Sequence, residues 1–244
     1  MAQRVAFSID GVTTTGLAAF PAGSAGVPGV VVTFHRGGLD EFTEWMVDDL
    51  AVQGFAAFAP DHFHVLPPDK TPDDRNAFMT DEQLARDLAA AARWLGAQER
   101  VIGDRLAIMG PCMGGRNAIV AAECHPELWR CVCAWYGGNL FKPLIGSLPA
   151  PGERERLARL ACPVEGYFGD LDVNPSPADV DRLDALLSAL GKPHVFHRYA
   201  GCHHGFLNRF TGRPGHYDGA AAVDSWRRAM RFLAQHLGAP AAVG

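Results

Sequence analysis

The segment Gly110-Pro111-Cys112-Met113-Gly114-Gly115 lies between an apolar stretch at residues 105–109 and a helical pattern at residues 113–124. Glycines two residues before and two residues after a nucleophile leave room for the sharp strand-to-helix turn that exposes its side chain. Such a turn strains the central residue, and the first amides of the following helix favour a thiolate. Cys112 is therefore the predicted nucleophile, although small buried cysteines are the commoner case.

Strands and helices alternate on both sides of this turn. Residues 4–9 and 14–20 predict an opening antiparallel hairpin, and residues 29–34 are typical of a strand buried on both faces. Further strands are expected at residues 55–59, 131–136, 164–168 and 194–199, and further helices at 41–53, 81–98, 177–190 and 217–237. The alternation predicts a single α/β domain over residues 1–244, with a mostly parallel central sheet and helices on both faces.

Two segments lack this regularity. Residues 62–80 contain three prolines and predict a long surface loop of the kind that borders functional sites. Residues 138–157 give the weakest pattern in the chain.

Composition narrows the class of partner. The chain is 48% hydrophobic and 20% charged, with a net charge of −5, so it has a sizeable core and no basic stripe for nucleic acid. The N-terminus lacks an apolar signal, and no apolar stretch is long enough to cross a bilayer. We expect a cytoplasmic monomer or small homo-oligomer that acts on a small molecule, with no nucleic-acid or membrane partner. Its six cysteines are read as thiols.

A nucleophilic cysteine needs a base and an acid that orients the base. In α/β-hydrolases these follow the nucleophile in the order Asp, then His. The strand at residues 164–168 leads to Asp170 and Asp172, and Asp172 is preferred because it can reach farther from the strand end. After the last strand come His203 and His204, and His204 is preferred because the glycine that follows it permits a tight loop.

A metal site is the alternative for the histidines and cysteines outside this set. The candidates are His62, His64, Cys131, Cys133 and Cys202 with its two neighbouring histidines. Structural zinc sites usually pair cysteines as Cys-x-x-Cys, a spacing that these residues lack. No metal and no other cofactor is therefore expected.

Over nearly its whole length the sequence resembles the dienelactone hydrolase family of α/β-hydrolases. The motifs that carry the likeness are Gly37-Gly38-Leu39, Gly54-Phe55, Ala59-Pro60-Asp61, the turn at residues 110–115, Phe168-Gly169-Asp170-Leu171-Asp172, Gly201-Cys202-His203-His204-Gly205-Phe206 and Tyr217-Asp218-Gly219-Ala220-Ala221. The resemblance implies a triad of Cys112, Asp172 and His204. It also implies an oxyanion hole made by the amides of Met113 and Arg36.

The sequence departs from the family pattern at two places. Where well-known members have a glutamate that holds the resting thiol, this chain has His35, which could instead stabilise a thiolate as an ion pair. Members that act on dienelactones bind the substrate carboxylate with two arginines. Arg75 could fill the first of these positions, while the second is Asn208, with Arg209 beside it.

The predicted function is hydrolysis of an ester or lactone. Cys112 would be acylated, His204 would transfer protons, Asp172 would orient the imidazole, and water would release the acid. The alternative is a non-catalytic small-molecule-binding homologue on the same fold, because folds can outlast their chemistry.

Overall fold

The computed structural model describes residues 1–23, 26–142, 152–213 and 216–238, which form one eight-stranded sheet. The strand order across the sheet is β1-β2-β4-β3-β5-β6-β7-β8. Strand β2 is antiparallel to both of its neighbours, and every other neighbouring pair is parallel. The strands are β1 (Gln3–Ile9), β2 (Val12–Ala19), β3 (Val27–Val32), β4 (Ala56–Pro60), β5 (Val101–Pro111), β6 (Val132–Trp135), β7 (Val164–Gly169) and β8 (His194–Tyr199).

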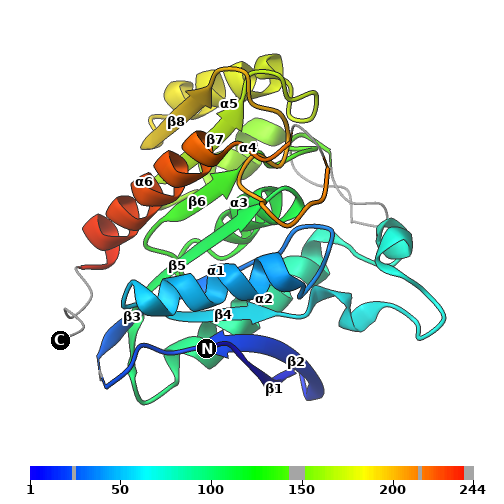
Figure 1. Ribbon diagram of the computed structural model, residues 1–244, viewed down its shortest axis with the longest axis vertical. Helices are drawn as coiled ribbons and strands as arrows, with labels where there is room; N and C mark the ends of the chain where they lie inside the picture. Colours follow the sequence, from blue (N-terminus) through cyan, green and yellow to red (C-terminus); the bar gives the residue numbers. More distant parts are fainter. Residues whose placement is uncertain (24–25, 143–151, 214–215, 239–244) are drawn as a thin grey trace.

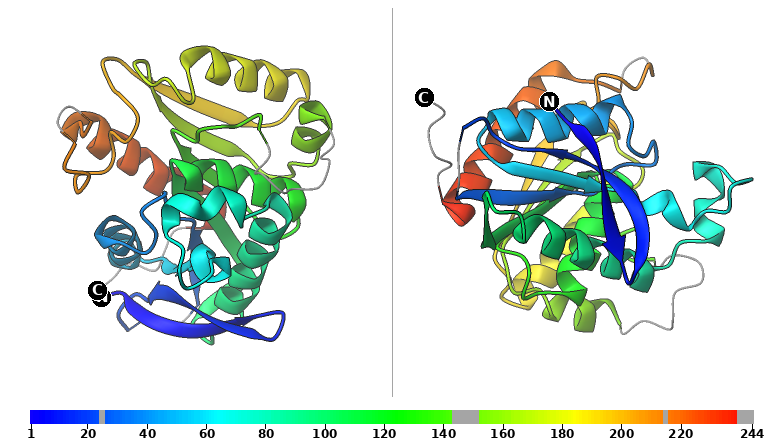
Figure 2. Two further views of the ribbon diagram at one scale, coloured as in Figure 1. Left: turned by 90° about the vertical axis from the view of Figure 1, so that its right-hand side faces the viewer. Right: turned by 90° about the horizontal axis from the view of Figure 1, so that it is seen from below.

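Helices cover both faces of this sheet (Figure 1, Figure 2). One face carries α1 (Glu41–Val52) and α6 (Gly219–Leu237), and the other carries α2 (Asp81–Gly96), α3 (Met113–Cys124), α4 (Glu153–Ala158) and α5 (Pro177–Ala189). The sheet therefore separates two apolar cores, as the alternation of strands and helices requires. The predicted fold class, a mostly parallel α/β sheet covered on both faces, is confirmed. No helix in the described ranges is long and apolar enough to cross a membrane.

The segment predicted as a long loop has more structure than expected. It contains two short 3₁₀ helices, η1 (His62–Val65) and η2 (Pro72–Ala77). The imidazole of His62 is fully buried and shares a hydrogen bond with the Thr33 hydroxyl, at 3.0 Å. Proline spacing alone could not show this contact, because Thr33 lies 29 residues earlier in the chain. Of the irregular segment at 138–157, residues 143–151 lie outside the described residues.

The turn after β5 depends on its glycines. A Cβ atom on Gly114 would lie 1.9 Å from the carbonyl oxygen of Thr33, and one on Gly110 would lie 2.3 Å from the same oxygen. Only glycine at both positions lets the loop after β3 approach the first turn of α3. Cys112 stands between them with φ 57° and ψ −124°, a strained backbone conformation for a residue with a side chain.

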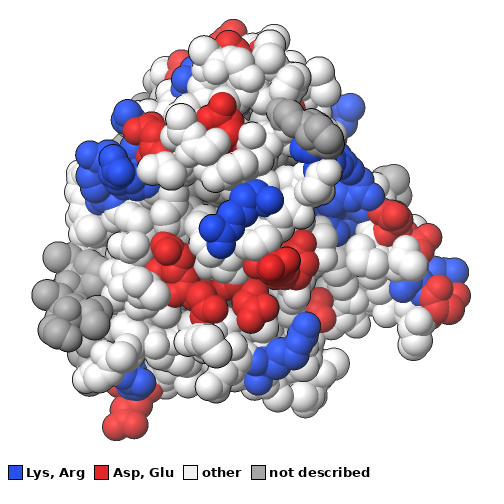
Figure 3. All heavy atoms as spheres, in the orientation of Figure 1, with Lys and Arg blue, Asp and Glu red and all other residues white. Residues whose placement is uncertain are grey.

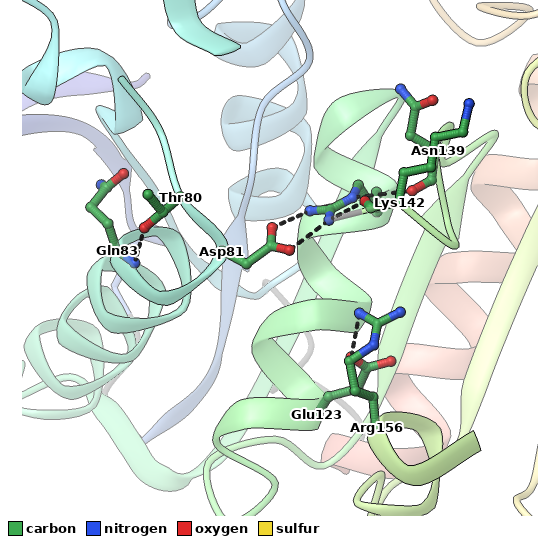
Figure 4. A network of polar contacts seen from close by, with 8 residues as sticks. Thr80, Asp81, Gln83, Glu123, Asn139, Lys142 and Arg156 are labelled. Carbon is green, nitrogen blue, oxygen red and sulfur yellow. Dashed lines mark hydrogen bonds and ion pairs between the residues drawn. The ribbon is translucent and has the colours of Figure 1, made fainter. Parts of the chain in front are cut away.

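The other side of α3 is fixed by a buried guanidinium (Figure 4). Arg116 donates two hydrogen bonds to the Asp81 carboxylate, at 2.7 and 2.8 Å, and a third to the carbonyl oxygen of Lys142, at 2.8 Å. Lower on the same helix, Glu123 forms an ion pair with Arg156 at 3.4 Å. Burial raises the pKa of Glu123 to about 7, and the opposing attraction of Arg156 does not offset it. Helix α3 is thus joined to α2, to α4 and to the loop after β6.

The variant Arg116→Met should lower the free energy of unfolding by about 3–5 kcal/mol, because it removes the two charge-assisted hydrogen bonds that Arg116 donates to the buried Asp81 carboxylate. Urea denaturation measures the loss. The double variant Arg116→Met/Asp81→Leu is the matched control, since it replaces both members of the buried ion pair by apolar residues. A double variant that loses as much stability as the sum of both single variants would contradict this account.

Candidate active site

Cys112 lies at the carboxyl end of β5, where it occupies the N-cap position of α3. Most helices of this protein begin with a side chain that accepts a hydrogen bond from their first turn, as Thr80 does for α2. Cys112 makes no such bond. The N-cap side chain therefore does not occupy the second and third amides of α3, although the Gly115 amide donates to the carbonyl oxygen of Cys112 at 3.0 Å.

His204 and Asp172 form a hydrogen-bonded pair beside this cysteine. The distance from Nδ1 of His204 to Oδ2 of Asp172 is 2.9 Å. The Asp172 side chain is 1% exposed and that of His204 is 32% exposed, so the carboxylate is shielded while the imidazole reaches the surface of a cavity. Because a carboxylate only accepts, Nδ1 donates, and Nε2 is left for a further partner.

The neighbouring candidates have other roles. The Asp170 carboxylate accepts a hydrogen bond from the Gly201 amide at 2.7 Å and so closes the turn between two loops. The His203 side chain is exposed and packs against His216, with 5.8 Å between the ring centroids. The structure thus brings Asp172 and His204, rather than Asp170 and His203, to Cys112.

The Asp172 carboxylate is held by a second loop. Its Oδ1 accepts a hydrogen bond from the Asn174 amide at 2.8 Å, and the Asn174 side chain accepts one from the Asn139 amide, also at 2.8 Å. The loop that contains Asn139 begins at Tyr136, whose ring lies 4.9 Å from that of His204. The same loop touches α3, because the Arg116 guanidinium donates to the carbonyl oxygen of Asn139 at 3.3 Å. The loop after β6 therefore contacts His204, the loop that holds Asp172, and the helix α3 that follows Cys112.

The charges of Cys112 and His204 stabilise each other. Burial alone would raise the pKa of the Cys112 thiol, but the hydrogen bond and positive charge of His204 outweigh burial and lower it. Burial alone would lower the pKa of His204, but its hydrogen bonds to Asp172 and Cys112 raise that pKa to about 10. Each group therefore favours the charged form of the other, the thiolate of Cys112 and the imidazolium of His204.

Two backbone amides also lower the pKa of the Cys112 thiol. They belong to Met113, the first residue of α3, and to Arg36, in the loop after β3. The predicted oxyanion-hole amides therefore converge on the sulfur from two different elements. The Arg36 side chain forms an ion pair with Asp73.

His35, the residue in place of the family glutamate, pairs with an acid. Its Nε2 lies 2.8 Å from Oδ2 of Asp40, the residue that caps α1. A Cβ atom on Gly37 would lie 2.5 Å from both the imidazole and the carboxylate, so this pair packs directly on a glycine backbone. His35 forms part of the cavity wall, but the groups that principally set the charge of Cys112 are His204 and the two amides.

A cavity of about 520 Å³ opens above Cys112. Its walls include the predicted residues His35, Arg36, His204 and Asn208, together with Asp40 and Asp73, which pair with His35 and Arg36. Arg213 and His216, which the sequence did not single out, also line it. His216 donates from Nδ1 to the carbonyl oxygen of His204 at 2.7 Å. Both residues were missed because only the folded path of the loop after β8 returns them to the site.

Arg75 and Arg209, the two arginines considered as substrate-binding residues, lie outside the wall of the cavity that contains Cys112. The Arg75 side chain is 18% exposed and donates to the carbonyl oxygen of Pro72 at 2.8 Å, outside the cavity wall, although its charge still reaches Cys112. Arg209 lies over the rings of Trp45 and Phe210, beside a separate cavity. Neither arginine lines the cavity of Cys112.

The histidines considered for a metal site have other partners. His62 bonds with Thr33, and Nε2 of His64 lies 2.8 Å from Oδ2 of Asp87. Burial lowers the pKa of His62 to about 3, which keeps its imidazole neutral. Within the described part of the chain, no group of three or more His, Cys, Asp or Glu side chains is arranged to hold a metal ion.

The model of the dienelactone hydrolase family matches residues 14–237. The chain belongs to this family. A relative from Salmonella typhimurium, named "Putative carboxymethylenebutenolidase", is 30% identical, and the match covers 89% of this chain and 80% of the relative. The carboxymethylenebutenolidase of Rhodococcus opacus is 25% identical, with 82% and 78% covered. This protein is thus a hydrolase of the dienelactone hydrolase family.

Solved structures agree with the fold. A crystal structure from Klebsiella pneumoniae, described as a "Putative Dienelactone Hydrolase", superposes with a TM-score of 0.85 at 24% sequence identity. The match covers 96% of this chain and 98% of that one. The shared architecture is the α/β-hydrolase fold.

Alkylation of Cys112 by iodoacetamide should show a midpoint below the pH of about 8.5 that an unperturbed thiol has. In His204→Gln the midpoint should rise above that pH, because burial then acts without the opposing positive charge. The rate at pH 7 should fall about tenfold or more, since each pKa unit is a factor of ten in thiolate. Peptide mass spectrometry localises the reaction, and His203→Gln is the matched control. An unchanged midpoint in His204→Gln would refute the ion pair.

Proposed function

We propose that this hydrolase cleaves a carboxylic ester or a lactone through a thioester on Cys112. The observation that carries the proposal is the convergence of the His204 imidazole and the amides of Met113 and Arg36 on one strained cysteine. A nucleophile, a base held by a buried acid, and two amide donors are the components of acyl transfer. Relatives named as butenolidases support the lactone, since a butenolide is an unsaturated lactone.

In the first half of the reaction, the Cys112 thiolate attacks the carbonyl carbon of the substrate. A carbon–sulfur bond forms while the carbonyl π electrons move to oxygen, where the amides of Met113 and Arg36 donate to the oxyanion. The oxyanion collapses and the bond to the leaving oxygen breaks. The His204 imidazolium gives its proton to that oxygen, which leaves as the alcohol. The product is a thioester and a neutral imidazole.

In the second half, the neutral His204 imidazole takes a proton from water as the water oxygen attacks the thioester carbon. The resulting oxyanion occupies the same two amides. Its collapse breaks the carbon–sulfur bond, releases the carboxylic acid and restores the thiolate beside the imidazolium. Asp172 keeps the imidazole in one orientation and stabilises its positive charge in both halves.

His35 has a different role in this proposal from that of the family glutamate. Because its Nε2 is engaged by Asp40, it supports the cavity wall and the loop that presents the Arg36 amide. The resting thiolate then depends on His204. Asn208 is 8% exposed and lines the same cavity. Its Oδ1 accepts a hydrogen bond from the Phe210 amide at 2.9 Å, so Nδ2 is the atom that can donate to the substrate.

Cys112→Ala should lose hydrolysis of aryl esters and small lactones by about a thousandfold or more, because it removes the nucleophile. Steady-state rates measure the loss, and thermal unfolding checks that the variant is folded. In the wild-type protein, rapid quenching with an aryl acetate should give a mass increase of one acetyl group on the peptide that contains Cys112. Full activity in Cys112→Ala would exclude the mechanism. A wild-type protein with no Cys112-dependent turnover on any substrate would instead favour the non-catalytic binding homologue.

We further expect a preference for substrates with a carboxylate, because the exposed Arg213 guanidinium lines the cavity and has no carboxylate partner within the described residues. Arg213→Gln should raise KM about tenfold for an ester that carries a carboxylate and leave KM for a matched neutral ester within twofold. Arg154→Gln, an exposed arginine in α4, is the control. Equal effects on both esters would exclude this role for Arg213.

A further inference from the structure

A second cavity, of about 400 Å³, lies beside the one that contains Cys112. It is bounded by α1, by α6 and by the loop that follows His204, and the two cavities have no lining residue in common. Its volume is within the range of about 300–1,000 Å³ that is typical of small-molecule sites. The proposed hydrolysis makes no use of this space.

One wall of this second cavity is aromatic and held in place. The rings of Trp45 in α1 and Trp226 in α6 lie 4.8 Å apart at an angle of 41°. The indole Nε1 of Trp226 donates to the Asp49 carboxylate at 2.6 Å, which fixes the orientation of the ring. The Trp226 ring also contacts Trp135 at 5.7 Å, and the Trp45 ring is stacked on Phe42 at 5.8 Å. Because ring faces are covered in this way, a ligand ring would meet the edges of the two indoles, and an edge-to-face contact is favourable.

The rim of the cavity carries two positive charges. The exposed guanidinium groups of Arg209 and Arg227 both line it, and within the described ranges neither has a carboxylate partner. By contrast the neighbouring Arg228 is paired with Asp224 at 2.6 Å. The Asp49 carboxylate, beside the aromatic wall, accepts the hydrogen bond from the indole of Trp226.

No acidic side chain among the residues that line the second cavity balances the charges of Arg209 and Arg227. Figure 3 shows the face that carries α1 and α6, where Asp and Glu side chains gather over α1 and Lys and Arg side chains gather beside α6. The residues that line the second cavity include no Asp or Glu. The cavity therefore combines an apolar floor with an unbalanced positive edge.

Arg209 is held in a position that suits a ligand. Its guanidinium carbon lies 4.7 Å from the centre of the Phe210 ring and 5.7 Å from that of Trp45, which are cation–π distances. A guanidinium stacked on rings keeps its N–H groups at the edge of its plane, where they can donate two parallel hydrogen bonds to a carboxylate. Asn208, the preceding residue, lines the cavity of Cys112, so consecutive residues serve different cavities.

We propose that the second cavity is a binding site for a small aromatic carboxylate. The ring of the ligand packs against Trp45 and Trp226, and its carboxylate is bound by Arg209 and Arg227. The site does not depend on Cys112 and stands whether or not the proposed hydrolysis is correct.

Titration with 1-naphthoate, followed by tryptophan fluorescence, tests this site. The Cys112→Ala protein is used so that no turnover occurs, and Trp45 and Trp226 report on occupancy. We expect saturable quenching, with Kd increased about tenfold or more in Arg209→Gln and in Arg227→Gln. Kd should be unchanged in Arg154→Gln, the matched control, and at least tenfold higher for the neutral analogue 1-naphthamide.

Three results would overturn the proposal. Naphthoate affinity that is the same in Arg209→Gln, in Arg227→Gln and in the parent protein would show that these arginines bind no carboxylate. Affinity lost in Arg213→Gln but kept in Arg209→Gln would place the anion in the cavity of Cys112. A dimer in sedimentation experiments that dissociates in Arg227→Gln would show that a second copy of the chain covers this surface.

Discussion

The contact between the Thr33 carbonyl and the glycine backbone at residues 110 and 114 is the constraint on which the site depends. It allows the loop after β3 to lie against the first turn of α3 with no side chain between them. The amides of Arg36 and Met113 then both act on the sulfur of Cys112. Two amides separated by 77 positions in the sequence thus act on one sulfur atom. This is possible because Gly110 and Gly114 have no side chain to hold the two backbone segments apart.

The electrostatics of the site follow from this geometry. Burial opposes charge on both Cys112 and His204, yet their mutual attraction, the two amides and the buried Asp172 carboxylate reverse the balance. His35 pairs with Asp40, while the positive charge that lowers the pKa of the Cys112 thiol comes from His204.

The loop after β6 joins parts of the site that are distant in sequence. Tyr136 packs on His204, and Asn139 is linked both to Asn174 in the Asp172 loop and to Arg116 in α3. The backbone at Gly137 also packs closely against α3, since a Cβ atom there would lie 2.7 Å from the Arg116 amide nitrogen. One short loop therefore contacts α3, the loop that contains Asp172, and His204.

The sequence by itself determined the mostly parallel sheet, the turn at Cys112 and the order of the acid and base candidates. These depend on periodicity and on glycine spacing within a few residues, which are local properties of the chain. The sequence could not show which arginine and histidine side chains line the cavity of Cys112. Arg75 and Arg209 were selected by their sequence distance from familiar motifs, whereas Arg213 and His216 line the cavity and Arg209 faces a second one. Only the tertiary structure decided this, because the path of the loop between β8 and α6 is set by packing against distant elements, and adjacent side chains on such a loop can point into different cavities.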